Sequence, residues 1–383
     1  MKVMESREER TSEHSAEAFI EALIKEARQH QHRRYVAFAV IAILVIAAAS
    51  TAVAMLTNHP AARKVAAGPT KPKVAGPPMG RAVSLKLAGP LAVGPNGALY
   101  VVDEQGHEVL VRLTNGQFRV VAGDGKDGFS GDGGPATKAA LSNVSDITFA
   151  PDGDLYMADG GRVRALNTAG IITTIAGNGR SGIVANGTPA LSAPLASPLY
   201  ITLSPNGRLY ISDGSQLLRL TATGKLATIR AVVTSGLLKG PLDRNLSQIA
   251  VDAHGDIDVS GFNGWSIWQV DPNGVATEVG TVAEARRSSG NTSILERGPD
   301  GAVYGEDGSN ILRIEGKRLV TSYTFTTVKG QYFWLTYFAF APNGAIYADE
   351  VPGDMGFEAH QQLVTVAGGY VTLLWQEKNR VAA

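Results

Sequence analysis

The chain has 383 residues, no cysteine, and 35 basic residues against 35 acidic ones. A net charge of zero argues against a nucleic-acid-binding protein, because there is no basic excess to neutralise phosphates. The absence of cysteine excludes disulfides and thiolate zinc sites, and the 44 glycines exceed the usual share of about 7%, which implies many tight turns.

The first segment, residues 1–34, is polar and charged, and we expect it to lie in the cytoplasm. Within it, Ser15–Arg28 has apolar residues at helical spacing, among them Phe19 and Leu23. This spacing predicts a short amphipathic helix with Ser15 as its N-cap. The helix either lies along the membrane or in water, or docks a cytoplasmic partner.

Residues 35–56 are predicted to form a transmembrane helix. No residue between Arg34 and Arg63 is charged, and a bilayer core of about 30 Å needs about 20 helical residues. Arg33 and Arg34 precede the apolar run, which favours a cytoplasmic N-terminus. The alternative is a cleaved signal peptide, because Ala52-Val53-Ala54 has the small-x-small pattern of a cleavage site. We predict a retained anchor in the cell membrane.

Residues 57–84 form a linker rich in proline and glycine. A chain of this composition is extended and semi-stiff, so it holds the following domain away from the bilayer. The sequence therefore predicts a single-pass protein whose C-terminal domain is extracytoplasmic.

The domain itself is built from repeats. The stretch Ala122–Tyr156 recurs 54 residues further on without a gap: Ala122-Gly123-Asp124-Gly125 falls on Ala176-Gly177-Asn178-Gly179, and Leu155-Tyr156 falls on Leu209-Tyr210. Self-similarity of this length indicates a repeat architecture.

A turn with glycine at its third position marks each of six repeats. The turns are Pro95-Asn96-Gly97, Pro151-Asp152-Gly153, Pro205-Asn206-Gly207, Ala253-His254-Gly255, Pro299-Asp300-Gly301 and Pro342-Asn343-Gly344. Asn-Gly or Asp-Gly between apolar runs is a strong hairpin signal, because glycine takes the positive φ that the turn needs.

Each repeat supplies about four short strands, which cannot bury both sheet faces alone, whereas six sheets stacked in a ring can. In the second repeat the expected strands are Asp146–Ala150, Leu155–Asp159, Val163–Leu166 and Ile171–Ala176. We predict an all-β, six-bladed β-propeller over residues 85–376, followed by a tail at 377–383. The sixth repeat carries all its own strands, so the ring is expected to close by packing of blade six on blade one.

The motif Gly128–Thr137, followed by Pro151-Asp152-Gly153, Leu155–Asp159 and Arg162-Val163-Arg164, resembles the NHL-repeat family of β-propellers. The order of anchor, linker and propeller is similar to that of bacterial membrane proteins with extracytoplasmic NHL domains. The resemblance implies a binding module. Some relatives of the fold are lyases or hydrolases that use metals in the central channel.

Acidic residues end the second strand in five of the six repeats: Asp103, Asp159, Asp213, Asp307 and Glu350. A ring of carboxylates can hold a cation, but aspartate also caps its own turn by accepting backbone N–H groups. Recurrence in nearly every blade favours the capping role. We therefore predict no metal site and no cofactor.

The least repetitive segments contain the candidate ligand-binding residues Trp265, Tyr332 and Trp334. Loops on a rigid scaffold often carry function, and aromatic residues are common interface anchors, although core packing is the alternative. The leading hypothesis is a non-catalytic binding or sensing module for a protein, glycan or small ligand. The alternatives are a lyase or hydrolase that uses a cation held by channel carboxylates, and an envelope scaffold.

Overall fold

The computed structural model describes residues 78–376, apart from 197–199, 234–239, 242–245, 247, 262–265, 282–293, 307–309, 317, 325–332, 353–361 and 368–369. These residues belong to Lys73–Ala383, the second of two units into which the chain divides. The helices predicted at 15–28 and 35–56 lie outside the described residues, as do the segments 1–34 and 377–383. In the part that is described, no helix is long and apolar enough to cross a bilayer.

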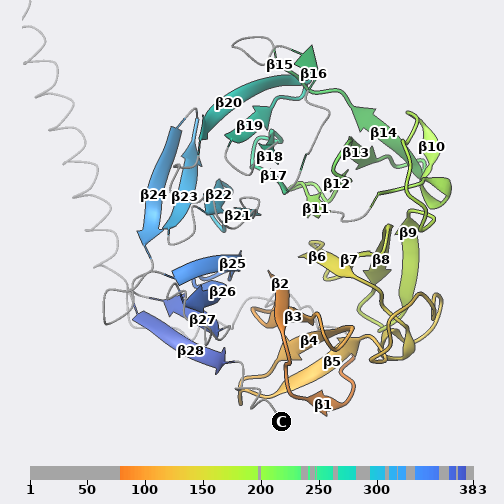
Figure 1. Ribbon diagram of the computed structural model, residues 1–383, viewed down its shortest axis with the longest axis vertical. Helices are drawn as coiled ribbons and strands as arrows, with labels where there is room; N and C mark the ends of the chain where they lie inside the picture. Colours follow the sequence, from red (N-terminus) through yellow and green to blue (C-terminus); the bar gives the residue numbers. More distant parts are fainter. Residues whose placement is uncertain are drawn as a thin grey trace, which may run out of the picture. The chain divides into compact units, whose positions relative to one another are not determined.

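Six β-sheets, one for each predicted repeat, make up this part of the chain (Figure 1). Blade one consists of β1 (Ala82–Val83), β2 (Ala88–Val93), β3 (Leu99–Asp103), β4 (Glu108–Arg112) and β5 (Phe118–Ala122). Blade two consists of β6 (Val144–Phe149), β7 (Leu155–Asp159), β8 (Arg162–Leu166) and β9 (Ile172–Ala176). Blade three consists of β10 (Thr188–Pro189), β11 (Tyr200–Leu203), β12 (Leu209–Ser212), β13 (Leu217–Leu220) and β14 (Lys225–Ile229). Two short 3₁₀ helices, η1 (Ala136–Lys138) and η2 (Ala190–Ser192), precede blades two and three.

The remaining three blades follow the same plan. Blade four consists of β15 (Val232–Val233), β16 (Gly240–Pro241), β17 (Ile249–Val251), β18 (Ile257–Gly261), β19 (Ser266–Val270) and β20 (Val275–Thr281). Blade five consists of β21 (Leu295–Arg297), β22 (Val303–Glu306), β23 (Asn310–Glu315) and β24 (Arg318–Thr324). Blade six consists of β25 (Phe333–Phe340), β26 (Ile346–Pro352), β27 (Gln362–Ala367) and β28 (Tyr370–Gln376). The predicted all-β, six-bladed propeller is therefore confirmed, and the strands predicted for the second repeat match β6–β9 to within two residues at each end.

Glycine has the predicted conformation at all six turns, with φ between 76° and 95°. In the first turn, the Gly97 N–H donates to the Gly94 carbonyl (2.8 Å), and the Asn96 carboxamide oxygen accepts the Ala98 N–H (3.0 Å). A side chain at Gly97 would be strained because L residues rarely adopt positive φ. The local signal thus fixes where each first strand ends.

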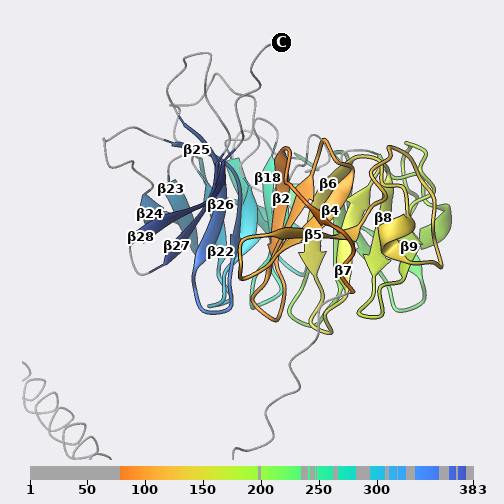
Figure 2. The ribbon, with the colours of Figure 1, turned by 90° about the horizontal axis from the view of Figure 1, so that it is seen from below.

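The innermost strands of the six sheets form a closed ring (Figure 1). β2 contacts β6, and contacts continue through β11, β17, β21 and β25 back to β2. Seen from the side, neighbouring blades stand next to one another (Figure 2).

Blade six closes the ring on blade one by packing, as predicted. In the described part of the chain, its sheet is built only from β25–β28. Ala339 and Leu363 of blade six share a buried apolar cluster with Val101 and Leu110 of blade one. The joint therefore depends on apolar contact and not on a shared strand.

The connectors into blades two and three repeat the same hydrogen bonds. Gly133 N–H donates to Ile172 O, and 54 residues later Gly187 N–H donates to Leu226 O, both at 2.8 Å. Each connector thereby lies along the outer strand of the blade that follows it, which fixes one blade against the next.

Candidate functional site

Described side chains from five of the six blades, all except blade two, meet at one end of the central channel. A cavity of about 260 Å³ there is lined by Leu87, Ala88, Glu104, Tyr200, Gln248, Ile294, Glu306, Leu335, Thr336 and Tyr337. These residues lie where the first strands begin and the second strands end. We call this cavity the channel mouth.

A narrower cavity of about 180 Å³ continues between the innermost strands. It shares Gln248, Ile294 and Tyr337 with the channel mouth. Its charged lining residues are Asp146, Glu296 and Arg297. We call this second cavity the lumen.

Asp146 joins two blades. Its carboxylate accepts the Ile147 N–H of its own strand (2.8 Å) and the Ile201 N–H of β11 in blade three (2.8 Å). These bonds satisfy edge N–H groups that face the channel. Burial nevertheless dominates and raises the pKa of Asp146 to about 7, although both hydrogen bonds act to lower it.

Glu296 faces the same lumen from blade five. Burial raises its pKa to about 8; the nearby Asp146 carboxylate raises it further, and Arg297 acts to lower it. Two like charges in one narrow space oppose joint ionisation. Both effects therefore favour the protonated form of these two carboxyl groups.

The channel mouth is also acidic. Glu104 and the 7% exposed Glu306 line it. Burial raises the pKa of Glu104, and the neighbouring Asp103 adds to that rise. Burial and the carboxylate of Glu104 raise the pKa of Tyr337. Across the channel mouth and lumen, four carboxylates thus accompany a single arginine among the described lining residues.

The described strand-end aspartates are not among the residues that line this cavity, and their carboxylates accept backbone N–H groups. Asp103 accepts the N–H groups of Gly106 (3.1 Å) and Leu87 (3.3 Å). Asp213 accepts the N–H groups of Ser215 (3.1 Å) and Gln216 (2.8 Å).

The other three acids predicted at strand ends are Asp159, Asp307 and Glu350. Asp159 accepts the Ser142 N–H (2.7 Å). Asp307 lies outside the described residues, and Glu350 belongs to β26 but its side chain is not described. Among the described residues, no group of three or more His, Asp or Glu side chains is placed to hold a metal ion.

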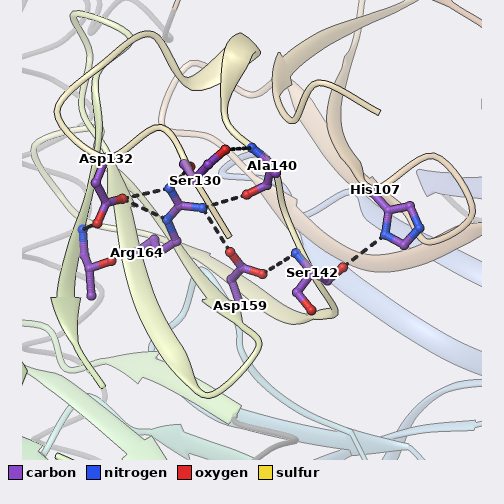
Figure 3. A network of polar contacts seen from close by, with 8 residues as sticks. His107, Ser130, Asp132, Ala140, Ser142, Asp159 and Arg164 are labelled. Atoms are coloured by element: carbon purple, nitrogen blue, oxygen red, sulfur yellow. Dashed lines mark hydrogen bonds and ion pairs between the residues drawn. The ribbon is translucent and has the colours of Figure 1, made fainter. Parts of the chain in front are cut away.

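Asp159 also belongs to a buried polar network around Arg164 (Figure 3). The fully buried guanidinium donates to Asp159 (3.1 Å), to Asp132 (2.7 and 3.1 Å) and to the carbonyls of Ala140 (3.0 Å) and Ser130 (2.8 Å). These bonds tie the glycine-rich connector to blade two. Asp132 of the connector therefore serves the fold.

Trp265 and Tyr332 lie outside the described residues, and Trp334 belongs to β25 but its side chain is not described. The flanking strand ends are informative, because β18 ends at Gly261 and β25 begins at Phe333. First strands begin and second strands end at the channel mouth, so both segments are joined to strands at that face.

Sequence reasoning missed the residues that line the channel. Asp146, Tyr200, Gln248 and Tyr337 each stand five positions before the first residue of a turn. The available signal was a polar or aromatic residue at a fixed distance before the turn in four of the six repeats. It was weak because alternation within a single strand does not reveal which residues meet across a ring.

Residues 114–185 match a family profile described as Teneurin NHL domain. Teneurin-m of Drosophila melanogaster is 31% identical over 160 residues, which are 36% of this chain and 6% of Teneurin-m. Human Teneurin-4 is 32% identical over 157 residues, which are 37% of this chain and 5% of Teneurin-4. The chain therefore spans only a small part of the length of these relatives.

Solved propellers are similar as well. The structure of selenomethionine-substituted virginiamycin B lyase from Staphylococcus aureus aligns with a TM-score of 0.44 and 14% sequence identity. The alignment covers 76% of this chain and 87% of that enzyme.

Proposed function

Because this chain belongs to the NHL-repeat β-propeller family, we propose that its propeller is a non-catalytic binding module that takes a small ligand with a protonated amine at the channel mouth. An NHL propeller is a rigid frame suited to binding or scaffolding. The observation that carries the proposal is the convergence of five blades on one acidic, aromatic cavity, which continues into the lumen that blade two also lines.

The charge and size of the cavity support this ligand class. Glu104, Glu306 and Asp146 supply acceptors, and Tyr200 and Tyr337 supply ring faces that attract a cation. The channel mouth and lumen have volumes of about 260 and 180 Å³, which suit a small molecule.

The test is calorimetric titration of the full-length chain in detergent with 1,5-diaminopentane, and with pentane-1,5-diol as the neutral probe. We expect the diamine to bind and the diol not to bind. Glu306→Gln should weaken diamine binding about tenfold, as expected for a charged hydrogen bond, while Glu278→Gln, at an exposed residue far along β20, should not. Equal responses to diamine and diol would refute the proposal.

We further propose that residues 35–56 anchor the propeller outside the cell membrane, with the N-terminus in the cytoplasm. The uncharged run supports this topology. The aromatic segments with Trp265, Tyr332 and Trp334 would then provide a second contact for a larger protein or glycan ligand at the channel-mouth face. Protease added to intact cells should cleave the linker 57–84 if the topology is right and leave it intact if the propeller is internal.

A second candidate function is catalysis by the lumen carboxyls. pKa values of about 7 for Asp146 and about 8 for Glu296 lie in the range of general acids and bases at neutral pH. A lyase or hydrolase would lose turnover in Glu296→Gln with a changed pH profile. A binding module would show no turnover of any ligand that it holds.

A further inference from the structure

A third cavity, of about 800 Å³, forms a groove between the outer part of blade three and blade four. It is lined by residues 183–186 of the connector, by β13 and β14, and by the turn Pro272–Gly274. Its only charged described lining residues are Arg219 and Arg230, with no carboxylate among them. The groove is therefore basic in a chain of zero net charge.

Comparison with blade five shows how an arginine at the equivalent position is neutralised there. Arg219 is opposite Tyr210 in the strand register, and Arg313 is opposite Tyr304, so the two arginines occupy equivalent positions. Arg313 donates to Asp300 (3.1 Å) and to Glu315 (2.5 Å). In blade five the guanidinium is therefore neutralised within its own blade.

Both of these carboxylates are replaced in blade three. Asp300, at the middle of its turn, corresponds to Asn206, and Glu315, two residues after the arginine, corresponds to Thr221. Asn206 instead bonds Ser204 (2.6 Å). Within the described residues, neither Arg219 nor Arg230 has an ion pair. The groove thus presents two guanidinium groups whose charge is not balanced locally.

Apolar and backbone features of the groove favour a peptide. Ile183 is 73% exposed and lines the groove beside Ile229. β14 is the outermost full strand of its blade, and β10 pairs with it only at Lys225 and Leu226. Among the described residues, β10 does not pair with the far half of β14, where the Thr228 N–H donates to the Asn186 side chain of the connector (3.1 Å).

We propose that this groove binds an acidic segment of a partner protein. A carboxylate of that segment pairs with Arg219, a second one reaches Arg230, and an apolar side chain between them packs on Ile183. Bidentate carboxylate–guanidinium geometry gives such a contact both strength and orientation. A sulfated glycan shares the negative charge but offers nothing to the exposed isoleucine, so the peptide is the better fit.

The test is fluorescence anisotropy with the full-length chain in detergent and a fluorescein-labelled peptide, Glu-Leu-Asp-Glu-Leu-Asp. The neutral control peptide is Gln-Leu-Asn-Gln-Leu-Asn. We expect the acidic peptide to bind more tightly than the neutral peptide. Higher salt should weaken binding of the acidic peptide, because the contact is partly exposed. Arg219→Gln should raise its Kd about tenfold, and Arg313→Gln, the equivalent but internally paired arginine, should leave it unchanged.

Ile183→Ser is the second variant. It should weaken binding of the acidic peptide without altering the binding of diamines at the channel mouth. Equal affinity for the acidic and neutral peptides, or an equal loss in Arg219→Gln and Arg313→Gln, would overturn the proposal. It would also be overturned if a heparin hexasaccharide bound at Arg219 and the acidic peptide did not displace it.

Discussion

Arg164 is fully buried and makes five hydrogen bonds to two carboxylates and two carbonyls (Figure 3). The net pKa shift differs between its two carboxylate partners, Asp132 and Asp159. Burial acts to raise the pKa of Asp132, but bonds from Thr174 and Arg164 outweigh burial and hold that pKa below its usual value. At Asp159, which is 1% exposed, burial outweighs the hydrogen bonds from Ser142 and Arg164 and raises the pKa of the carboxyl group. A buried charge of this kind is tolerated only while its partners remain.

Arg164→Leu should lower the free energy of unfolding by about 3–5 kcal/mol, because it leaves the buried Asp159 carboxylate without its counter-charge and removes the partner of the partly exposed Asp132. Blade three has leucine at the equivalent residue, Leu218, and has Asn186 in place of Asp132. The double variant Arg164→Leu, Asp132→Asn copies that arrangement and should recover part of the loss. Urea unfolding of the three proteins measures both effects. A single variant as stable as the parent protein would contradict this account.

The lumen carboxyls act on stability through protons. The folded pKa values of Asp146 and Glu296, about 7 and about 8, lie above the unfolded values of about 4. Between these limits the folded chain binds more protons than the unfolded chain, so stability falls as pH rises. The stabilisation is complete below about pH 4 for these two groups and is lost as pH rises through 7 and 8.

Glu296→Gln should therefore make the melting temperature less dependent on pH between 5 and 9. At pH 9 the variant should be more stable than the parent protein, since no charge needs to be buried in the lumen. Glu278→Gln, at an exposed residue, is the matched control and should keep the parental slope. Parallel melting curves for all three proteins across this range would rule out the buried titration.

At the scale of the strand pair, the aspartate at the end of the second strand organises the turn into the third strand. In blade three the Asp213 carboxylate accepts the N–H groups of Ser215 and Gln216. Gln216 in turn exchanges hydrogen bonds with Val184 of the connector (2.6 and 2.9 Å). One cap therefore orders a turn and also holds the connector that leads into the blade.

Asp213→Ala should destabilise the propeller by about 1–3 kcal/mol, because buried N–H groups lose their acceptor. Asp213→Asn keeps a carbonyl oxygen in the same place and should cost less. Thermal unfolding of both variants, with and without calcium, separates the two roles predicted for this residue. A cation ligand would lose a calcium-dependent shift in both variants, whereas a turn cap gives the graded loss with no calcium effect.

At the scale of the whole ring, one joint differs from the other five. The chain itself crosses from each blade to the next, but blades six and one meet only through side-chain packing among the described residues. A covalent connection keeps neighbouring blades at high effective concentration. The joint between β25 and β2 lacks that help and is the place where the ring should open first.

Hydrogen exchange should therefore be faster in β2 and β25 than in β6 and β11. Leu363→Ala at the joint should accelerate exchange in β2 and β25 in particular. Leu218→Ala is equally buried (both residues are 0% exposed) but lies in the cluster between blades two and three, so it should leave that difference unchanged. Each variant should lower the free energy of unfolding by about 2–5 kcal/mol. Uniform exchange around the ring would show that the joint is no weaker than the others.

The sequence by itself determined the number of blades, the turn glycines and most strand bounds in the described part. These depend on local signals: a glycine with φ of 80° at Gly97, an apolar strand before it and a repeat 54 residues later. Such signals act over a few residues and recur, so they can be found in a single chain. The helices predicted at 15–28 and 35–56 rest on the same kind of local evidence and remain predictions.

Only the tertiary structure decided where chemistry gathers. Asp146 and Glu296 are 150 positions apart in the chain, yet they face one lumen because closure of the ring brings β6 and β21 to the same axis. Arg313 lies 13 residues after Asp300 in the chain, and only the pairing of the strands brings its guanidinium to that carboxylate. Turn and strand propensities are properties of neighbouring residues, whereas a cavity is a property of residues that only a closed ring places together.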